Sequence, residues 1–415
     1  MQNLTRISTI IKIIAVSYII LLFIAALTII PYVDSYYYWF WSQHLQMAYV
    51  DGPPLIGYVI YLSTLIFGNS TLAINIVGTI VAIISFLIIT DITRTILEPK
   101  DNNSNKIALI VGVLWLTNYH IVAHRIATFI TYDGLVNLFE LGAILAILKY
   151  ITYKKNRYIY ITGICAGLAL FTKFSAIISL AIILAYFLFN PKLRQIFKSY
   201  HIYLTILIAL VIFSPVLIWN YEHNWSSFIF QLHRHTHVQL AGQSHFYSII
   251  WFIRTSLLDP ILPFLIVLLI SKYLASKKPK QNLSFTTSPN IKLLTLLQIG
   301  MVGFWGIMAF KSDVPDRWLL LFESLFTISV GLVLLKNNNV KLLFLIIAFN
   351  LIRSVGLLVQ DSYTTPNLVC HNIYTQEKGI KFTSPFATYI KPAKNASDFC
   401  YLELTKCVGK DCWTP

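Results

Sequence analysis

Long apolar runs separated by short polar segments cover most of this 415-residue chain. The first run, residues 13–30 (IIAVSYIILLFIAALTII), has no charged residue over eighteen positions, about the length at which a helix can cross a bilayer. Runs of the same kind recur to the end of the chain, so the pattern predicts an all-α polytopic membrane protein. Eleven membrane-spanning helices are expected at residues 10–31, 74–94, 107–124, 134–152, 158–172, 174–190, 201–219, 246–271, 293–310, 317–335 and 341–359.

The first run has a second interpretation, because Arg6 and Lys12 precede it as they would precede a secretory signal peptide. The run is longer than the apolar region of a typical signal peptide, and no small-x-small cleavage site lies before Pro31. We therefore expect it to be the first membrane-spanning helix.

A shorter apolar segment at residues 55–67 follows the pair Pro53-Pro54. It is too short to span comfortably, which favours an interfacial or re-entrant helix on the outer side. A true crossing is the alternative, and it would reverse the sidedness of every later loop unless another span were lost.

The distribution of charged residues along the chain supports this membrane topology. Charged residues make up 12% of the sequence and hydrophobic ones 57%, whereas soluble domains carry roughly 25% charged residues. The net charge of +15 arises mainly from short basic segments between the apolar runs. With a cytoplasmic N-terminus, eleven crossings place all of these segments in the cytoplasm, as the positive-inside rule requires. The positive charge thus has a topological explanation, and no nucleic-acid partner is expected.

The same topology divides the chain into a transmembrane domain, residues 1–359, and an outer tail, residues 360–415. Four of the five cysteines lie in that tail. An even number of cysteines in a short polar segment on an oxidising face predicts disulfides. Metal binding by four thiolates is the alternative, but the spacing lacks a CxxC pair. The predicted disulfide-stapled unit contains Cys370, Cys400, Cys407 and Cys412.

The first outer loop, residues 32–73, contains the most unusual stretch of the chain, VDSYYYWFWSQHLQMAYVDGPP. Amphipathic rings suit the headgroup layer of a membrane, but that preference leaves Asp34 and Asp51 unexplained. We therefore expect this loop to be catalytic. Its candidate substrate-lining residues are Tyr37, Tyr38, Trp41, His44, Pro53 and Pro54.

Charges of both signs reach the predicted outer face from at least six segments. Each one alone could be a snorkelling side chain or a local ion pair. Together they suit a reaction between an anionic lipid-linked donor and a hydroxyl or amine acceptor, in which a carboxylate is the base and cations hold phosphate. The candidate acids on this face include Asp34, Asp51 and Asp133, and the candidate cations include Lys173, Arg234, Lys311, Arg317 and Arg125.

Other classes of chemistry lack their sequence signatures. The chain has no Walker loop, no GxGxxG in a strand context and no HExxH motif. No metal site and no cofactor is predicted, and a requirement for a divalent metal stays open.

Four motifs in order resemble the family 39 glycosyltransferases of the GT-C class. They are DSYYYWFWSQHL with DGPPLIGYVI, then ITYDGLVNLFELGAILAI, GLALFTKFSAI and SPVLIWNYEHNWSSFIFQLHRH. Together they cover roughly residues 10–260. Bacterial lipid A aminoarabinose transferases and protein O-mannosyltransferases are similar in overall plan, which implies a GT-C-like bundle.

By that resemblance Asp34 matches the family's catalytic carboxylate, and Asp51 and Asp133 match later acidic positions. Lys173 is the best-matched cation. The chain departs from the family at Ser35, where Glu is frequent, at Tyr37, where the aminoarabinose transferases have Arg, and at Gly52, where relatives often have His. A Lys before the proline pair is also missing. Ser35 leaves open which acid assists Asp34, and the absent Arg and Lys weaken the transfer of the relatives' donor-phosphate ligands.

The resemblance implies an inverting glycosyltransferase that uses a polyprenyl-phosphate sugar at the periplasmic face of a bacterial inner membrane. Its acceptor is expected to be lipid A or another envelope glycolipid first, and a protein Ser or Thr second. A polytopic lipid or sugar transporter or flippase is the competing class, but internal repeats, which transporters often show, are not evident. A structural scaffold is a third possibility, which the concentration of outer carboxylates disfavours.

Overall fold

The computed structural model describes residues 2–29, 31, 33–97, 103–127, 130–237, 245–275, 289–311, 314–337 and 339–362. These residues form helices joined by turns, with one isolated β-bridge between Tyr49 and Gly52. The predicted all-α class is therefore confirmed. The predicted tail lies outside the described residues from residue 363 onward, and its four cysteines with it.

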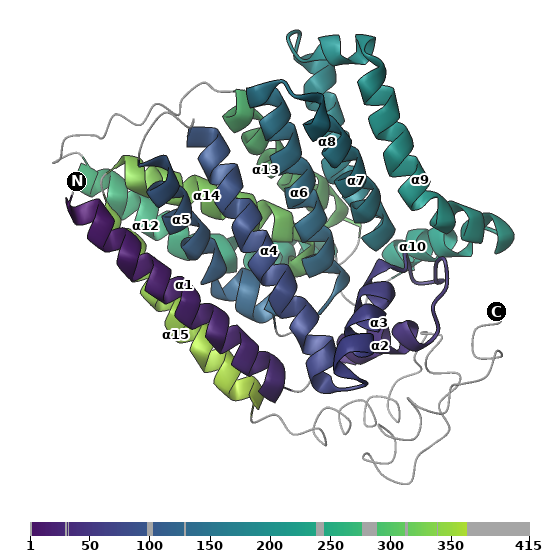
Figure 1. The fold of residues 1–415 in the computed structure, drawn as a ribbon, viewed down its shortest axis with the longest axis horizontal. Coiled ribbons are helices and arrows are strands. Elements are labelled where there is room, and N and C mark those ends of the chain that lie inside the picture. The colour runs from purple at the N-terminus through teal and green to yellow at the C-terminus, as the bar shows by residue number, and fades with distance from the viewer. Residues whose placement is uncertain are drawn as a thin grey trace.

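Fifteen α-helices and four shorter helical segments follow one another in the described parts of the chain (Figure 1). The π-helical segments are η1 (Tyr119–Ala127) and η3 (Ile253–Leu258), and the 3-10 segments are η2 (Arg194–Lys198) and η4 (Asp316–Leu319). The α-helices are α1 (Gln2–Thr28), α2 (Val33–Gln43), α3 (Leu55–Phe67), α4 (Thr71–Leu97), α5 (Ser104–Leu116), α6 (Tyr132–Tyr153), α7 (Asn156–Thr172), α8 (Ala176–Phe189), α9 (Tyr200–Glu222), α10 (Ser226–His237), α11 (His245–Phe252), α12 (Asp259–Ala275), α13 (Pro289–Met308), α14 (Leu320–Lys336) and α15 (Val340–Ser362).

The chain is a multi-pass membrane protein, but the predicted count of eleven crossings is not confirmed. Among the described residues, seven helices are long and apolar enough to cross a membrane. An eighth arises if residues 247–258 and 261–273, which meet at a bend of 51°, form one span. The other three predicted spans correspond to shorter elements, namely α5 with η1, α7 and α8.

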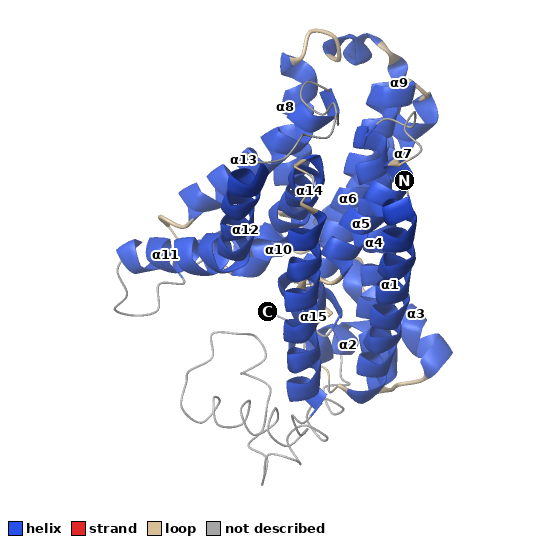
Figure 2. Cartoon of the chain, turned by 90° about the vertical axis from the view of Figure 1, so that its left-hand side faces the viewer, coloured by secondary structure: helices blue, strands red, loops and turns tan. Residues whose placement is uncertain are grey.

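The spans differ in how deeply they are buried by the rest of the protein. Most residues of α4, α6 and the span 316–336 are buried, whereas at most a third are buried in the spans of α1, α9, α13 and α15. The first three therefore form the centre of the bundle, and the others lie around it (Figures 1 and 2). Exposed apolar side chains on the outer helices are suited to lipid contact.

A glycine allows one close approach inside this core. A Cβ added to Gly78 of α4 would lie 2.3 Å from the backbone oxygen of Ile126 in η1. Only glycine allows α4 and η1 to pack at that distance. This contact fixes η1 against the centre of the bundle, just before α6 begins.

Helices α2 and α3 pack against each other at one end of the bundle (Figure 1). Trp41 of α2 is fully buried and stacks on Tyr49, with ring centroids 3.7 Å apart. The Tyr49 hydroxyl donates to the backbone oxygen of Trp41 or of His44. These contacts make residues 33–67 a packed unit at that end of the bundle.

Candidate active site

Three charged side chains from distant parts of the sequence form an ion-paired cluster. Lys173 Nζ lies 2.5 Å from Asp133 Oδ1, and Arg317 Nε lies 3.4 Å from Asp133 Oδ2. The Asp133 side chain is only 8% exposed, whereas that of Arg317 is 43% exposed. One buried carboxylate thus holds two cations, and the cluster as a whole carries a positive charge.

Local structure explains where each member of this cluster lies. Asp133 is in the first turn of α6, where the helix dipole favours a negative charge. Lys173 follows the last residue of α7 in an extended conformation, and its ammonium lies 5.3 Å from the centre of the Trp318 ring. Arg317 lies in η4, immediately before α14. The face of Trp318 attracts the Lys173 cation and helps to fix its position.

Tyr38 of α2 is the point on which the carboxylates of the first loop and this cluster converge. Its side chain is buried, and the charges of Asp34, Asp51, Asp133 and Arg317 all act on its hydroxyl. Burial, and then the charges of the three carboxylates, raise the pKa of the Tyr38 hydroxyl well above its ordinary value. The phenol therefore stays protonated at physiological pH.

Asp34 is partly buried at the start of α2. Its charge acts on Arg317 as well as on Tyr38. Asp34 and Arg317 are 283 residues apart in the sequence, yet the fold brings their charges within electrostatic range. Asp34 therefore lies within electrostatic range of the cation that contacts Asp133.

Asp51 lies in the tight turn that leads into α3. Gln231 of α10 donates from Nε2 to the backbone oxygen of Asp51 at 2.5 Å. Gly52 has φ = +153°, which a side chain would strain, and the proline pair after it is buried. The turn therefore has a fixed shape, and the Asp51 charge acts on Tyr38 and Tyr132.

The aromatic residues of the first loop pack on one another beside the acids. The Tyr38 ring lies 4.6 Å from that of Tyr132 and 5.6 Å from that of Tyr37. His44 stacks on Phe40, with centroids 4.8 Å apart. Tyr37 is partly exposed, so its ring can meet a substrate, while the buried rings support the wall behind it.

Sequence reasoning missed several polar residues deeper in the same region. Glu140 of α6 is buried, and Ser179 donates to its Oε1 at 2.6 Å. Asn137 donates to Ser324 Oγ of α14 at 3.4 Å. Asp133, Asn137 and Glu140 follow the i, i+4, i+7 spacing of one helix face, so the motif YDGLVNLFE contained a signal for this polar face.

Some predicted site residues are not joined to the cluster by a described contact. Lys311 is exposed in the turn after α13. The side chains of Arg125 and Arg234, and the four tail cysteines, lie outside the described part of the structure. Among the described residues, no group of three or more His, Cys, Asp or Glu side chains could hold a metal ion.

Comparison with known proteins supports the predicted resemblance. Residues 51–219, less than half of the chain, match the family model for dolichyl-phosphate-mannose-protein mannosyltransferase. Over 194 residues the chain is 23% identical to the lipid A galacturonosyltransferase RgtD of Rhizobium johnstonii. That match covers 46% of this chain and 39% of the relative, so it spans well under half of RgtD's length.

Solved structures show the fold. ArnT from Cupriavidus metallidurans bound to undecaprenyl phosphate has a TM-score of 0.62 at 13% identity, over 92% of this chain and 68% of ArnT. Archaeal oligosaccharyltransferase AglB from Archaeoglobus fulgidus, in complex with an inhibitory peptide and a dolichol-phosphate, has a TM-score of 0.52 at 13% identity over 90% of this chain and 59% of AglB. The similarity to GT-C glycosyltransferases is confirmed, and the chain has an ArnT-like fold.

Proposed function

We propose that this protein is an inverting glycosyltransferase that moves a sugar from a polyprenyl-phosphate donor to an acceptor of the cell envelope. The observation that carries the proposal is the set of charges around Tyr38. Three carboxylates and Arg317 act on that one hydroxyl, and Lys173 joins the set through Asp133. A donor with a charged phosphate and an acceptor that must lose a proton need both signs in one place.

Asp34 is the proposed general base. It takes the proton from the acceptor hydroxyl or amine as the acceptor's oxygen or nitrogen attacks C1 of the sugar. The bond between C1 and the phosphate oxygen breaks, and its electron pair leaves with the polyprenyl phosphate. A single displacement of this kind inverts the configuration at C1.

Lys173 and Arg317 are the proposed ligands of the departing phosphate. Lys173 supplies a point charge and Arg317 a planar fork of donors. Asp133 is a positioning residue, because it contacts both cations and keeps them close together. Arg125, Arg234 and Lys311 stay further candidates for the same phosphate.

The proposed acceptor is lipid A or another envelope glycolipid, with a protein Ser or Thr second. The sequence relative RgtD is named a lipid A galacturonosyltransferase, and the matched family model is described as a protein mannosyltransferase family. The proposed location is the bacterial inner membrane, with the site facing the periplasm. Undecaprenyl phosphate in ArnT and dolichol-phosphate in AglB support a lipid-linked donor.

Replacement of Asp34 by Asn tests the mechanism. Asp34→Asn keeps the size of the side chain and removes the base, so transfer should fall by about 10²–10⁴-fold. The assay mixes the enzyme with polyprenyl-phosphate sugars and envelope lipids, both extracted from the source cells. Mass spectrometry then measures how much sugar has been transferred to the lipids. Polyprenyl-phosphate binding by the variant should stay close to that of the wild type.

Glu222→Gln is the matched control, because Glu222 is an exposed carboxylate at the end of α9. This variant should transfer sugar normally. Full activity in a stable Asp34→Asn protein would remove Asp34 from the mechanism. Envelope lipids and glycoproteins that are identical in a deletion strain and its parent would contradict the proposed function itself.

A further inference from the structure

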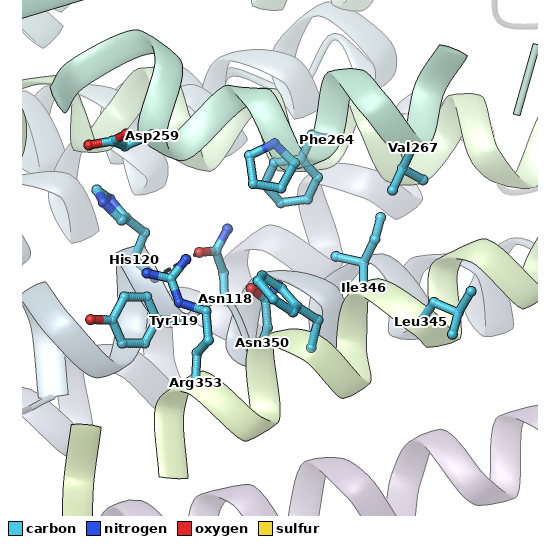
Figure 3. A pocket seen from close by; sticks show the side chains of 12 residues that line it. Asn118, Tyr119, His120, Asp259, Phe264, Val267, Leu345, Ile346, Asn350 and Arg353 are labelled. Carbon is cyan, nitrogen blue, oxygen red and sulfur yellow. Dashed lines mark hydrogen bonds between the residues drawn. The ribbon is translucent and has the colours of Figure 1, made fainter. Parts of the chain in front are cut away.

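A cavity of about 270 Å³, whose lining contains no residue of the Asp133 cluster, lies between η1, α12 and α15. Figure 3 shows its side chains arranged by character. Asp259, His120 and Arg353 lie towards one end, and Val267, Ile346 and Leu345 lie towards the other. A cavity with one polar and one apolar end is suited to an amphiphile.

The order of residues along the two helices follows the same division. In α12 the charged Asp259 comes first and Val267 eight residues later, whereas in α15 Leu345 comes first and Arg353 eight residues later. Eight residues of helix rise about 12 Å. Since both charges lie at the same end of the cavity, its polarity changes with depth along the bundle.

Both charges at the polar end can take a ligand. Asp259 and Arg353 have no ion-pair partner in the part of the chain that the structure describes. The Arg353 guanidinium lies over the Tyr119 ring, 4.1 Å from its centroid, which fixes its direction without neutralising its charge. A ligand that presents a negative and a positive group would complement both residues.

Asn350 adds an unsatisfied donor to this cavity. Its side chain is 7% exposed, and its Nδ2 atom is buried without a hydrogen-bond partner among the described residues. Buried amide groups in native proteins nearly always have a partner. Asn350 lies one turn before Arg353 on α15, so both residues line the cavity from the same side of that helix.

We infer that the cavity binds one phospholipid with a phosphoethanolamine headgroup from the surrounding bilayer. Arg353 and Asn350 Nδ2 donate to its phosphate oxygens, and its ammonium donates to Asp259. An acyl chain lies along Phe264, Val267 and Ile346 towards the middle of the membrane. The proposed topology puts Arg353 towards the outer end of its span, which favours a lipid of the outer leaflet. Asp259 lies near the middle of the predicted span 246–271, at the bend where α12 begins.

Native mass spectrometry of the full chain, purified and stripped of lipid, tests this site without any sugar donor. The probes are phosphatidylethanolamine, phosphatidylcholine and phosphatidylglycerol with identical acyl chains. Wild-type protein should bind one phosphatidylethanolamine about tenfold more tightly than either other lipid, because only its headgroup has both a phosphate and N–H donors for a carboxylate.

Two variants separate the two charges. Asp259→Asn should lower phosphatidylethanolamine binding to the level of phosphatidylglycerol and leave the other two lipids unchanged. Arg353→Gln should weaken all three about tenfold. Arg254→Gln is the control, because Arg254 is exposed in η3 and does not line the cavity, and it should bind all three lipids as the wild type does.

Thermal unfolding in the absence of lipid checks that each variant is folded. Asp259→Asn keeps the shape of an exposed side chain, so its result decides the inference even if Arg353→Gln is unstable. Equal binding of the three headgroups by wild-type protein, or an unchanged headgroup preference in folded Asp259→Asn, would overturn the inference. Neither outcome bears on transfer at Asp34, so the two proposals fail separately.

Discussion

Lys173→Gln examines the leaving-group side of the proposed reaction. The Lys173 ammonium contacts Asp133 at 2.5 Å, faces the Trp318 ring at 5.3 Å, and belongs to a side chain that is 20% exposed. Glutamine keeps a polar side chain of similar reach but removes the charge. If Lys173 stabilises a departing phosphate, the loss resembles removal of one oxyanion donor, which costs about 10²–10³-fold in kcat.

The same structure sets the expected cost in stability. Removal of one partner from a buried pair costs about 3–5 kcal/mol when the other charge is left uncompensated. Here Asp133 keeps Arg317 at 3.4 Å, so the loss should be close to one charged hydrogen bond, about 1.5–3 kcal/mol. The variant should therefore fold, and its transfer defect should exceed what lost protein explains.

The assay combines single-turnover transfer, binding of polyprenyl phosphate and thermal unfolding. Lys192→Gln is the matched control, because Lys192 is an exposed lysine in the turn after α8 that no described contact joins to the cluster. Lys173→Arg should recover part of the activity, since it restores the charge with a different geometry. Normal transfer and normal phosphate binding in folded Lys173→Gln would refute the reasoning.

Three further predictions concern other parts of the chain. Tyr38→Phe should lower transfer without moving the pH profile of the reaction between about pH 6 and 9, because the raised pKa keeps the Tyr38 phenol protonated there. The stability of the wild-type protein should fall above about pH 10, where this tyrosine ionises in the unfolded state alone. Urea unfolding should show a smaller fall for Tyr38→Phe. Reporter fusions after Lys198 should indicate the cytoplasm and fusions after Asp361 the outer face, and a cytoplasmic signal at Asp361 would contradict the proposed threading. If the four tail cysteines form two disulfides, alkylation of denatured, non-reduced protein from its native membrane should label Cys165 alone, and labelled tail thiols would contradict the pairing.

Much of the fold could be predicted because hydropathy is a local property of the sequence. All seven long apolar helices coincide with predicted spans, and α3 is a separate helix of 13 residues, as its length suggested. The count of eleven crossings is not confirmed because three predicted spans depend on elements that are short by themselves, such as α5 with its π-helical continuation η1. Hydropathy does not reveal a change of helix type within one apolar run.

The sequence indicated which residues belong to the candidate site better than it indicated which of them contact one another. Asp34, Asp133 and Lys173 were expected from family motifs, and Arg317 from topology and charge alone. The structure adds that Asp133 holds both cations, which suggests positioning instead of base catalysis for that carboxylate. No spacing in the sequence indicates this pairing, because Lys173 and Arg317 are 144 residues apart.

The order of residues is enough to indicate that this chain crosses the membrane repeatedly and that its first loop carries carboxylates among rings. Apolar runs must avoid water and charges must avoid lipid, and both constraints act residue by residue. Which charges meet depends on the folded chain. It gathered the carboxylates and Arg317 around Tyr38, and it enclosed the amphiphilic cavity between η1, α12 and α15. Packing between helices sets these positions, and packing depends on surfaces that distant parts of the chain present to one another.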